Sequence, residues 1–144
     1  VGDWVGEGRG DFPTIDPYSW TERTSYRHVG KPVLIYEQRT RDAITGEPRH
    51  AESRYLRPGP EPGTFEFVVA HSTGHLEMAG GSVADGRVVL ETTAVLGTPT
   101  AKDVAALKRT IDLDGDTLRV NLAMAAVGEP MTEHLTAELT RAPT

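Results

Sequence analysis

The sequence predicts an all-β protein, built as an antiparallel closed β-barrel of about ten strands. Short segments of alternating polar and apolar residues recur along the 144 residues, and turn-forming Gly, Pro and Asp residues separate them. Helical periodicity is scarce. Because hairpin follows hairpin, we expect an antiparallel meander, and a barrel of more than eight strands generally encloses a ligand cavity.

The first predicted strand, residues 4–10, combines one large aromatic residue with repeated glycine. Trp4 stands among glycines at positions 2, 6, 8 and 10. Glycine weakens an ordinary strand, so its repetition indicates a sharp bend or the close approach of another backbone or a flat group. We expect the ring of Trp4 to be buried and to fill one end of the barrel.

The other predicted strands follow the same alternation between turns. All ten are predicted at residues 4–10, 19–28, 33–41, 50–56, 64–71, 75–78, 87–93, 101–113, 117–127 and 133–141. The clearest is 117–127, where Leu118, Leu122 and Met124 lie on one face and Arg119 and Asn121 on the other. This pattern is typical of a barrel wall with one face inward. Gly80-Gly81 is interpreted as a turn.

Length, cysteine content and charge narrow the class of protein. The length predicts a single domain, residues 1–144, with a core large enough to need no disulfide or metal. The lack of cysteine excludes thiolate chemistry and iron–sulfur clusters, and it fits a reducing compartment, so we expect a cytoplasmic protein. A net charge of −6 argues against nucleic acid or an anionic membrane as partner. A homodimer is compatible with the sequence, which does not define the oligomeric state.

Candidate chemistry rests on the five histidines. His71 and His75 are four residues apart, but a turn rather than a helix separates them, so the spacing predicts no zinc site. His50 and Glu52 share a strand face, which suits the acid–base pair of a hydrolase. Spacing alone favours the simpler interpretation, a surface ion pair.

His134 opens the last predicted strand, directly after a proline-containing turn. A histidine held at such a corner suits an axial metal ligand. Strict alternation, however, places His134 with Thr136 and Glu138, opposite Leu135, and therefore toward solvent. An inward His134 requires a β-bulge near Thr132 or a polar inner face on this strand.

The chain resembles the nitrobindins, a family of ferric-haem-binding β-barrels of the peroxynitrite isomerase type. The matching segments follow one another in order over nearly the whole chain: GDWVGEG (2–8), DFPTI (11–15), HVGKP (28–32), EPRHAES (47–53), AHSTG (70–74) and the stretch 124–135. The resemblance implies a ten-stranded barrel shaped like lipocalins and fatty-acid-binding proteins, with one ferric haem b near its mouth. It also implies isomerisation of peroxynitrite to nitrate and reversible binding of nitric oxide.

The resemblance further assigns roles to individual residues. His134 corresponds to the axial ligand of the haem iron and thus to the catalytic centre, Met124 and Val104 to pocket residues, and His50 to a histidine on the distal side. Arg49 stands where some relatives have methionine, which puts a cation near the distal entrance.

The haem propionates need basic or polar partners at the rim. Lys102 and Lys108 are an even number of residues from Val104, so on a regular strand they face the same side as Val104 and are candidates to bind the propionates. Thr21 is a weaker candidate. Two other classes of function remain open. One is a fatty-acid-binding-protein-like carrier of an apolar small molecule, in which His134 is incidental, and the other is the hydrolase built on His50.

Overall fold

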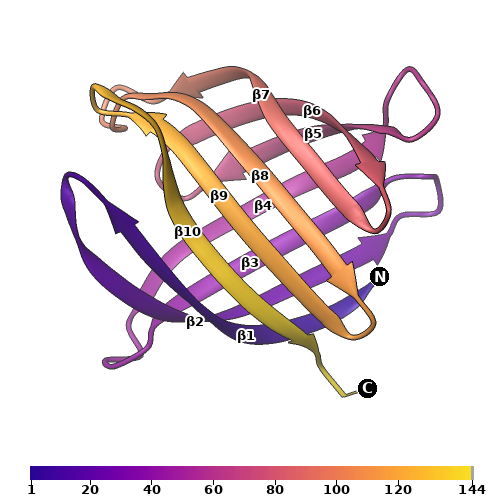
Figure 1. The fold of residues 1–144 in the computed structure, drawn as a ribbon, viewed down its shortest axis with the longest axis horizontal. Coiled ribbons are helices and arrows are strands. Elements are labelled where there is room, and N and C mark those ends of the chain that lie inside the picture. Colours follow the sequence, from indigo (N-terminus) through magenta and orange to yellow (C-terminus); the bar gives the residue numbers. More distant parts are fainter. Residues whose placement is uncertain (144) are drawn as a thin grey trace.

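The computed structural model describes residues 1–143, which form ten strands that close into a barrel (Figure 1). The strands are β1 (Gly2–Phe12), β2 (Ile15–His28), β3 (Leu34–Asp42), β4 (Pro48–Pro58), β5 (Thr64–His71), β6 (His75–Ala84), β7 (Arg87–Gly97), β8 (Val104–Asp114), β9 (Thr117–Ala126) and β10 (Glu129–Arg141). The predicted fold class is therefore confirmed.

Each strand pairs antiparallel with its neighbours in sequence, and β1 pairs with β10 to close the barrel. In such a meander, the ends of odd-numbered strands and the starts of even-numbered strands meet at one end of the barrel. We call this end the mouth. It lies on the left in Figure 1, where the β1–β2 and β9–β10 hairpins extend.

One predicted boundary is wrong in an informative way. Gly80 and Gly81 were expected to form a turn after residue 78, but both lie within β6 and pair with Glu91 and Leu90 of β7. A Cβ atom on Gly81 would overlap the backbone carbonyl of Val89, so the glycine allows the two strands to approach closely. The pair therefore marks a curved strand rather than its end.

The end opposite the mouth is filled by apolar side chains. Trp4 is 3% exposed and packs with Leu118 and Leu139, while the guanidinium of Arg141 lies 4.3 Å from the centre of its ring. The predicted burial of Trp4 at one end of the barrel is confirmed. A second apolar cluster, which includes Phe67 and Leu90, lies beside the first, and Ile111 packs against both.

Two glycines of β1, Gly8 and Gly10, are explained by rings on the neighbouring strand β2. A Cβ atom on Gly8 would lie 2.2 Å from the ring of Trp20, and one on Gly10 would lie 2.6 Å from the ring of Tyr18. Both rings come from β2, so the expected close approach occurs within the barrel's own wall. These aromatic side chains fill the space that side chains on β1 would otherwise occupy.

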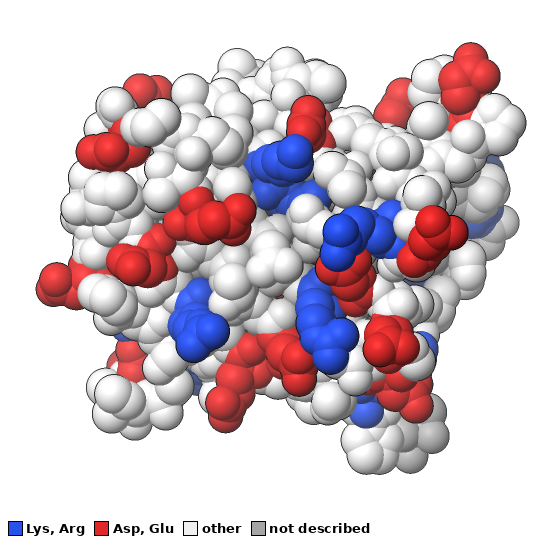
Figure 2. Space-filling model, in the orientation of Figure 1, with Lys and Arg blue, Asp and Glu red and all other residues white. Residues whose placement is uncertain are grey.

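The outer surface carries charges of both signs, interspersed over the face shown in Figure 2. Along β7 to β10, several of them form exposed cross-strand ion pairs: Arg87 with Asp112, Lys108 with Glu91, and Arg119 with Glu138. Such pairs contribute little to stability. Within residues 1–143, no helix is long and apolar enough to cross a membrane.

Candidate haem site at the barrel mouth

The barrel topology gathers most of the side chains singled out from the sequence at the mouth. They lie at the ends of odd strands, the starts of even strands or the loops between them: Arg49, His50, His71, His75, Lys102, Val104, Met124 and His134. Thr21 and Lys108 lie further along β2 and β8.

His134 sits at an irregularity in β10. Its neighbour Glu133 pairs with Ala123 of β9, whereas Leu135 pairs with Leu122, so one extra residue is accommodated between them. A second irregularity falls between Glu129 and Thr132. A bulge re-aims the side chain that it carries, which is why strict alternation failed to describe this position. His134 is half-buried rather than solvent-exposed, so the expectation from alternation alone is wrong.

The imidazole of His134 is held from two sides by the end of β1. Its Nδ1 atom lies 3.0 Å from the backbone carbonyl oxygen of Asp11, and its ring meets Phe12 edge to face at 5.3 Å between centres. A carbonyl can only accept, so Nδ1 carries the hydrogen and the neutral ring keeps a lone pair on Nε2. Nε2 has no hydrogen-bond partner among residues 1–143.

The electrostatics keep this imidazole uncharged. Burial lowers the pKa of His134, and the nearby His50 lowers it further, against the opposing effect of Asp11. Metal ligation requires the neutral ring, and a ligand histidine commonly donates its other N–H to a carbonyl. The protonation state and orientation of His134 thus fit a haem ligand bound through Nε2.

A hollow of about 670 Å³ opens beside His134 and is bordered by Tyr18, Ile44 and Arg49. Its volume lies in the range of small-molecule sites, about 300–1,000 Å³. Met124, Val104 and His50 do not border this hollow.

Arg49 is fixed at the edge of the hollow. Its guanidinium pairs with the carboxylate of Asp42 at 2.9 Å and lies 4.6 Å from the centre of the Tyr18 ring. Hydrogen bonds from the backbone of Thr45, from Arg49 and from the backbone of Ile44 hold the pKa of Asp42 far below its usual value. Arg49 is therefore a cation in a fixed orientation beside the hollow.

Met124 and Val104 lie on the wall opposite β4. Met124 pairs with Leu107 and Thr132, and Val104 pairs with the buried Ala126, so both positions follow the inward face of the barrel. Met124 stands opposite Thr132 of β10, two residues before His134.

The assignment of Lys108 to the haem propionates at the rim is wrong because β8 carries a bulge. Val104 pairs with Ala126 while Ala106 pairs with Ala125, so strand parity shifts between them. Lys108 therefore does not share a face with Val104; it is exposed and pairs with Glu91 on the outer surface. Lys102 remains at the mouth, in the loop before β8.

Thr21 is likewise on the outer face. It alternates with the buried Trp20 and Glu22 along β2 and is exposed. The structure brings neither Thr21 nor Lys108 together with His134.

His50 belongs to a second group of polar side chains, behind the mouth and inside the barrel. His50 Nε2 lies 3.4 Å from an oxygen of Glu52, which is 7% exposed, so the two do not form the surface ion pair favoured by spacing alone. His71 joins them from β5 and lies between two carboxylates, with Nδ1 at 3.2 Å from Glu52 and Nε2 at 3.1 Å from Glu77.

Two buried arginines complete this group. Arg54 pairs with Glu52 at 2.9 Å and stacks on the Tyr36 ring, while Arg109 pairs with Glu77. Burial raises the pKa of Glu52, but Arg54 and the neighbouring histidines outweigh it and hold that pKa well below its usual range.

Sequence reasoning missed His71, Glu77, Arg54 and Arg109 as parts of one cluster. The sequence did contain one signal, because charged residues occupy strand positions whose side chains face the barrel interior. Glu52 and Arg54 alternate with exposed residues on β4, as Glu77 does on β6. Their mutual contacts depend on the register of four different strands, which no local pattern contains.

The fold and this site define a class of protein: a closed ten-stranded β-barrel whose mouth presents a neutral, oriented histidine beside an open hollow. The family model for the THAP4-like, heme-binding β-barrel domain matches residues 1–141. The chain belongs to this family of haem-binding barrels, the nitrobindin family.

Curated relatives and a solved structure are similar to this chain over nearly its whole length. The chain is 46% identical to "Peroxynitrite isomerase 2" of Mycobacterium avium, over 98% of this chain and 89% of the relative. It is 46% identical to "Peroxynitrite isomerase" of Nocardia farcinica, over 98% and 86%. The crystal structure of Rv2717c from Mycobacterium tuberculosis superposes with a TM-score of 0.92 at 41% identity, over 99% of this chain and 92% of that one.

Proposed function

We propose that this protein is a haem-dependent peroxynitrite isomerase that binds one ferric haem b per chain through Nε2 of His134. The observation that carries the proposal is the hydrogen bond from His134 Nδ1 to the Asp11 carbonyl, which fixes the tautomer and leaves Nε2 free at the edge of the hollow. The similarity to proteins named peroxynitrite isomerase gives the reaction. We assign the whole of residues 1–144 to this one domain.

The other mouth residues take supporting roles in this proposal. Met124 and Val104 contribute apolar contacts, and His50 takes the distal-side role that the family resemblance implies, in which its imidazole modulates access or protonation. Arg49 and Lys102 are the cations placed to meet the propionates, since both lie at the mouth. Arg49 is the better placed of the two because Asp42 and Tyr18 hold it beside the hollow.

Bound haem would supply a ferric iron, a Lewis acid for the peroxynitrite anion and, in the ferrous or ferric state, a site for nitric oxide. The protein's part would be to hold the haem through His134. Phe12 and the Asp11 carbonyl restrict the rotation of His134, and burial keeps its ring neutral at pH 7.

A carrier of apolar molecules is disfavoured by the barrel interior. Arg54 and Arg109 do point inward, as a fatty-acid carrier requires, but Glu52 and Glu77 already pair with them. A fatty carboxylate would have to displace these ion pairs, and the buried Phe67 lies against both guanidinium groups.

The proposal is tested by stopped-flow measurement of peroxynitrite decay with the hemin-loaded protein, together with the nitrate yield. We expect the wild type to accelerate decay and to direct the product to nitrate, and His134→Ala, matched for hemin concentration, to lose most of this effect. His28→Ala, a change in a histidine far from the mouth, serves as control. Equal acceleration by the wild type, His134→Ala and free hemin would refute the proposal.

A further inference from the structure

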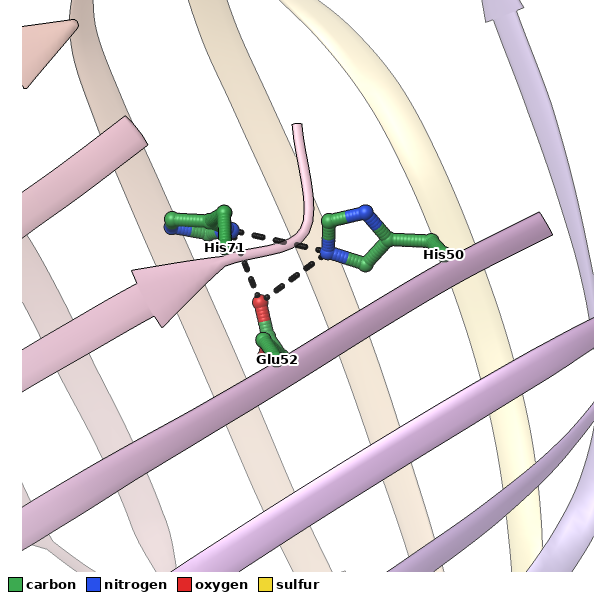
Figure 3. Close-up of side chains that lie close together, drawn as sticks. All are labelled: His50, Glu52 and His71. Atoms are coloured by element: carbon green, nitrogen blue, oxygen red, sulfur yellow. Dashed lines mark hydrogen bonds and ion pairs between the residues drawn. The ribbon is translucent and has the colours of Figure 1, made fainter. Parts of the chain in front are cut away.

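Three potential metal ligands converge inside the barrel, behind the mouth. Figure 3 shows His50, Glu52 and His71 pointing at one another from β4 and β5. The separations are 3.4 Å from His50 Nε2 to Glu52 Oε2, 3.2 Å from His71 Nδ1 to Glu52 Oε2, and 3.5 Å from His71 Nδ1 to His50 Nε2. A tetrahedral Zn²⁺ ion with bonds of about 2.1 Å holds its ligand atoms about 3.4 Å apart. The triangle already has the dimensions of a metal site.

The surrounding groups orient these ligands. The other ring nitrogen of His71, Nε2, lies 3.1 Å from Glu77, and the other oxygen of Glu52, Oε1, accepts from Arg54 at 2.9 Å. A carboxylate behind a histidine is the usual outer partner of a metal-bound imidazole, since it fixes the tautomer and increases ligand basicity. Oε2 of Glu52 is thereby left to face the two histidines.

The net charge of the buried side chains also favours a bound cation. Among the described residues, the buried ionic side chains are three glutamates, Glu22, Glu52 and Glu77, and two arginines, Arg54 and Arg109. One negative charge is therefore uncompensated. A proton on His71 would balance it, but a divalent ion can take the place of that proton and also engage His50, whose Nε2 lies 3.5 Å from Nδ1 of His71. A divalent ion uses all three atoms and leaves one positive charge for an anionic fourth ligand.

We propose that His50, Glu52 and His71 form a second metal site that binds one first-row divalent cation, with Zn²⁺ as the best fit, and leaves a fourth position open. This site goes beyond the proposed haem function and uses none of the His134 contacts. Two histidines and one carboxylate with an open position are the ligand set of catalytic zinc, where the ion acts as a Lewis acid.

His75 provides a matched control, since it is a neighbouring histidine that is already engaged. Its Nε2 donates to the backbone carbonyl of Lys102 at 2.7 Å, and its Nδ1 accepts from Thr73 at 2.9 Å. Both nitrogens are therefore occupied. Replacing His75 should leave metal binding unchanged.

The test is a titration of the protein with Co²⁺, a coloured substitute for Zn²⁺, followed by competition with Zn²⁺. We expect one equivalent to bind with the strong visible bands of tetrahedral Co²⁺, and Zn²⁺ to displace it. His50→Ala and His71→Ala should each weaken binding by at least about tenfold, whereas His75→Ala should not. His50 is the less buried of the two, so His50→Ala keeps the test decisive if circular dichroism shows that His71→Ala does not fold.

Two results would overturn the proposal: binding that is equally strong in the wild type, His50→Ala and His71→Ala, or binding that is lost only in His134→Ala. Failure of the wild type to bind Co²⁺ stoichiometrically would do the same. Hemin binding is measured on the same samples. Because the two sites use different ligands, a protein that takes up Co²⁺ but not hemin would refute the haem proposal alone.

Discussion

The imidazole of His134 donates from Nδ1 to the backbone carbonyl of Asp11, at 3.0 Å, across the seam where β1 and β10 close the barrel. The two residues are 123 positions apart in the sequence, so closure of the barrel creates the contact. Because the acceptor belongs to the backbone, no side-chain substitution at Asp11 removes it. The orientation of the histidine is thus tied to the fold itself.

The ring of Phe12, together with the backbone carbonyl of Asp11, fixes the orientation of His134. Phe12→Ala removes a ring that is 4% exposed and that meets His134 edge to face, so we expect a loss of about 3–5 kcal/mol in the free energy of unfolding and weaker hemin binding. Phe12→Leu should retain most of the stability. Urea unfolding and hemin titration measure the two effects. Hemin affinity in folded Phe12→Ala equal to that of the wild type would show that the ring does not position His134.

Gly8 should tolerate no side chain. Gly8→Ala places a methyl group 2.2 Å from the Trp20 ring, so we expect a destabilisation of about 1–3 kcal/mol, measured by urea unfolding. Gly80→Ala is the matched control, because a Cβ atom there has its nearest neighbour, a carbonyl of Phe65, at 3.8 Å. Equal stability of the two variants would contradict the close approach of β2 to β1.

The buried pair of Arg109 and Glu77 should respond differently from a surface pair. Arg109→Met leaves the fully buried Glu77 without its cation, at an expected cost of about 3–5 kcal/mol. Arg119→Met, which breaks the exposed pair with Glu138, should cost less than about 1 kcal/mol. In the double variant Glu77→Leu/Arg109→Met, much of the loss should be recovered. Strictly additive effects in this cycle would argue that the two side chains do not interact.

His71 should make stability fall at alkaline pH. Burial lowers the pKa of His71, but hydrogen bonds to Glu52 and Glu77 outweigh it and raise that pKa above its ordinary value of about 6.5. The folded state then holds its proton more tightly than the unfolded state. The stabilisation is complete below about pH 6.5 and is lost as pH rises through the folded-state pKa.

The measurement is the free energy of unfolding between about pH 6.5 and 9, in the presence of a chelator that keeps metal ions away. The wild type and His75→Gln should lose stability across this range, whereas His71→Gln should show a flatter profile. A decline of the same size in His71→Gln would assign the effect to another group. A rise in wild-type stability would contradict the direction of the shift.

The barrel could be predicted because its determinants are local. Alternation in 117–127 identified β9, and the glycines of β1 indicated the close approach that Trp20 and Tyr18 make. Bulges were the main source of error. An extra residue near Ala105 and another at His134 change which strand positions face inward. Simple alternation therefore predicted the wrong face for Lys108 and a solvent-facing side chain for His134.

The candidate site was only partly predictable for a related reason. His134 could be singled out by its corner and by resemblance, but its direction depends on a bulge and on an acceptor at the far end of the chain. The group formed by His50, Glu52 and His71 depends on the register between β4 and β5, where Glu52 stands opposite His71. Spacing along β4 indicated His50 and Glu52 but not their contact with His71.

The central claim, that His134 holds the haem, is tested most directly by titrating the purified protein with hemin and following the Soret band. The account predicts a saturable band at one hemin per chain in the wild type and in His28→Ala, and its loss or a large shift in His134→Ala that stays folded by circular dichroism. Diffuse binding in the wild type, or an identical saturable band in His134→Ala, would contradict it.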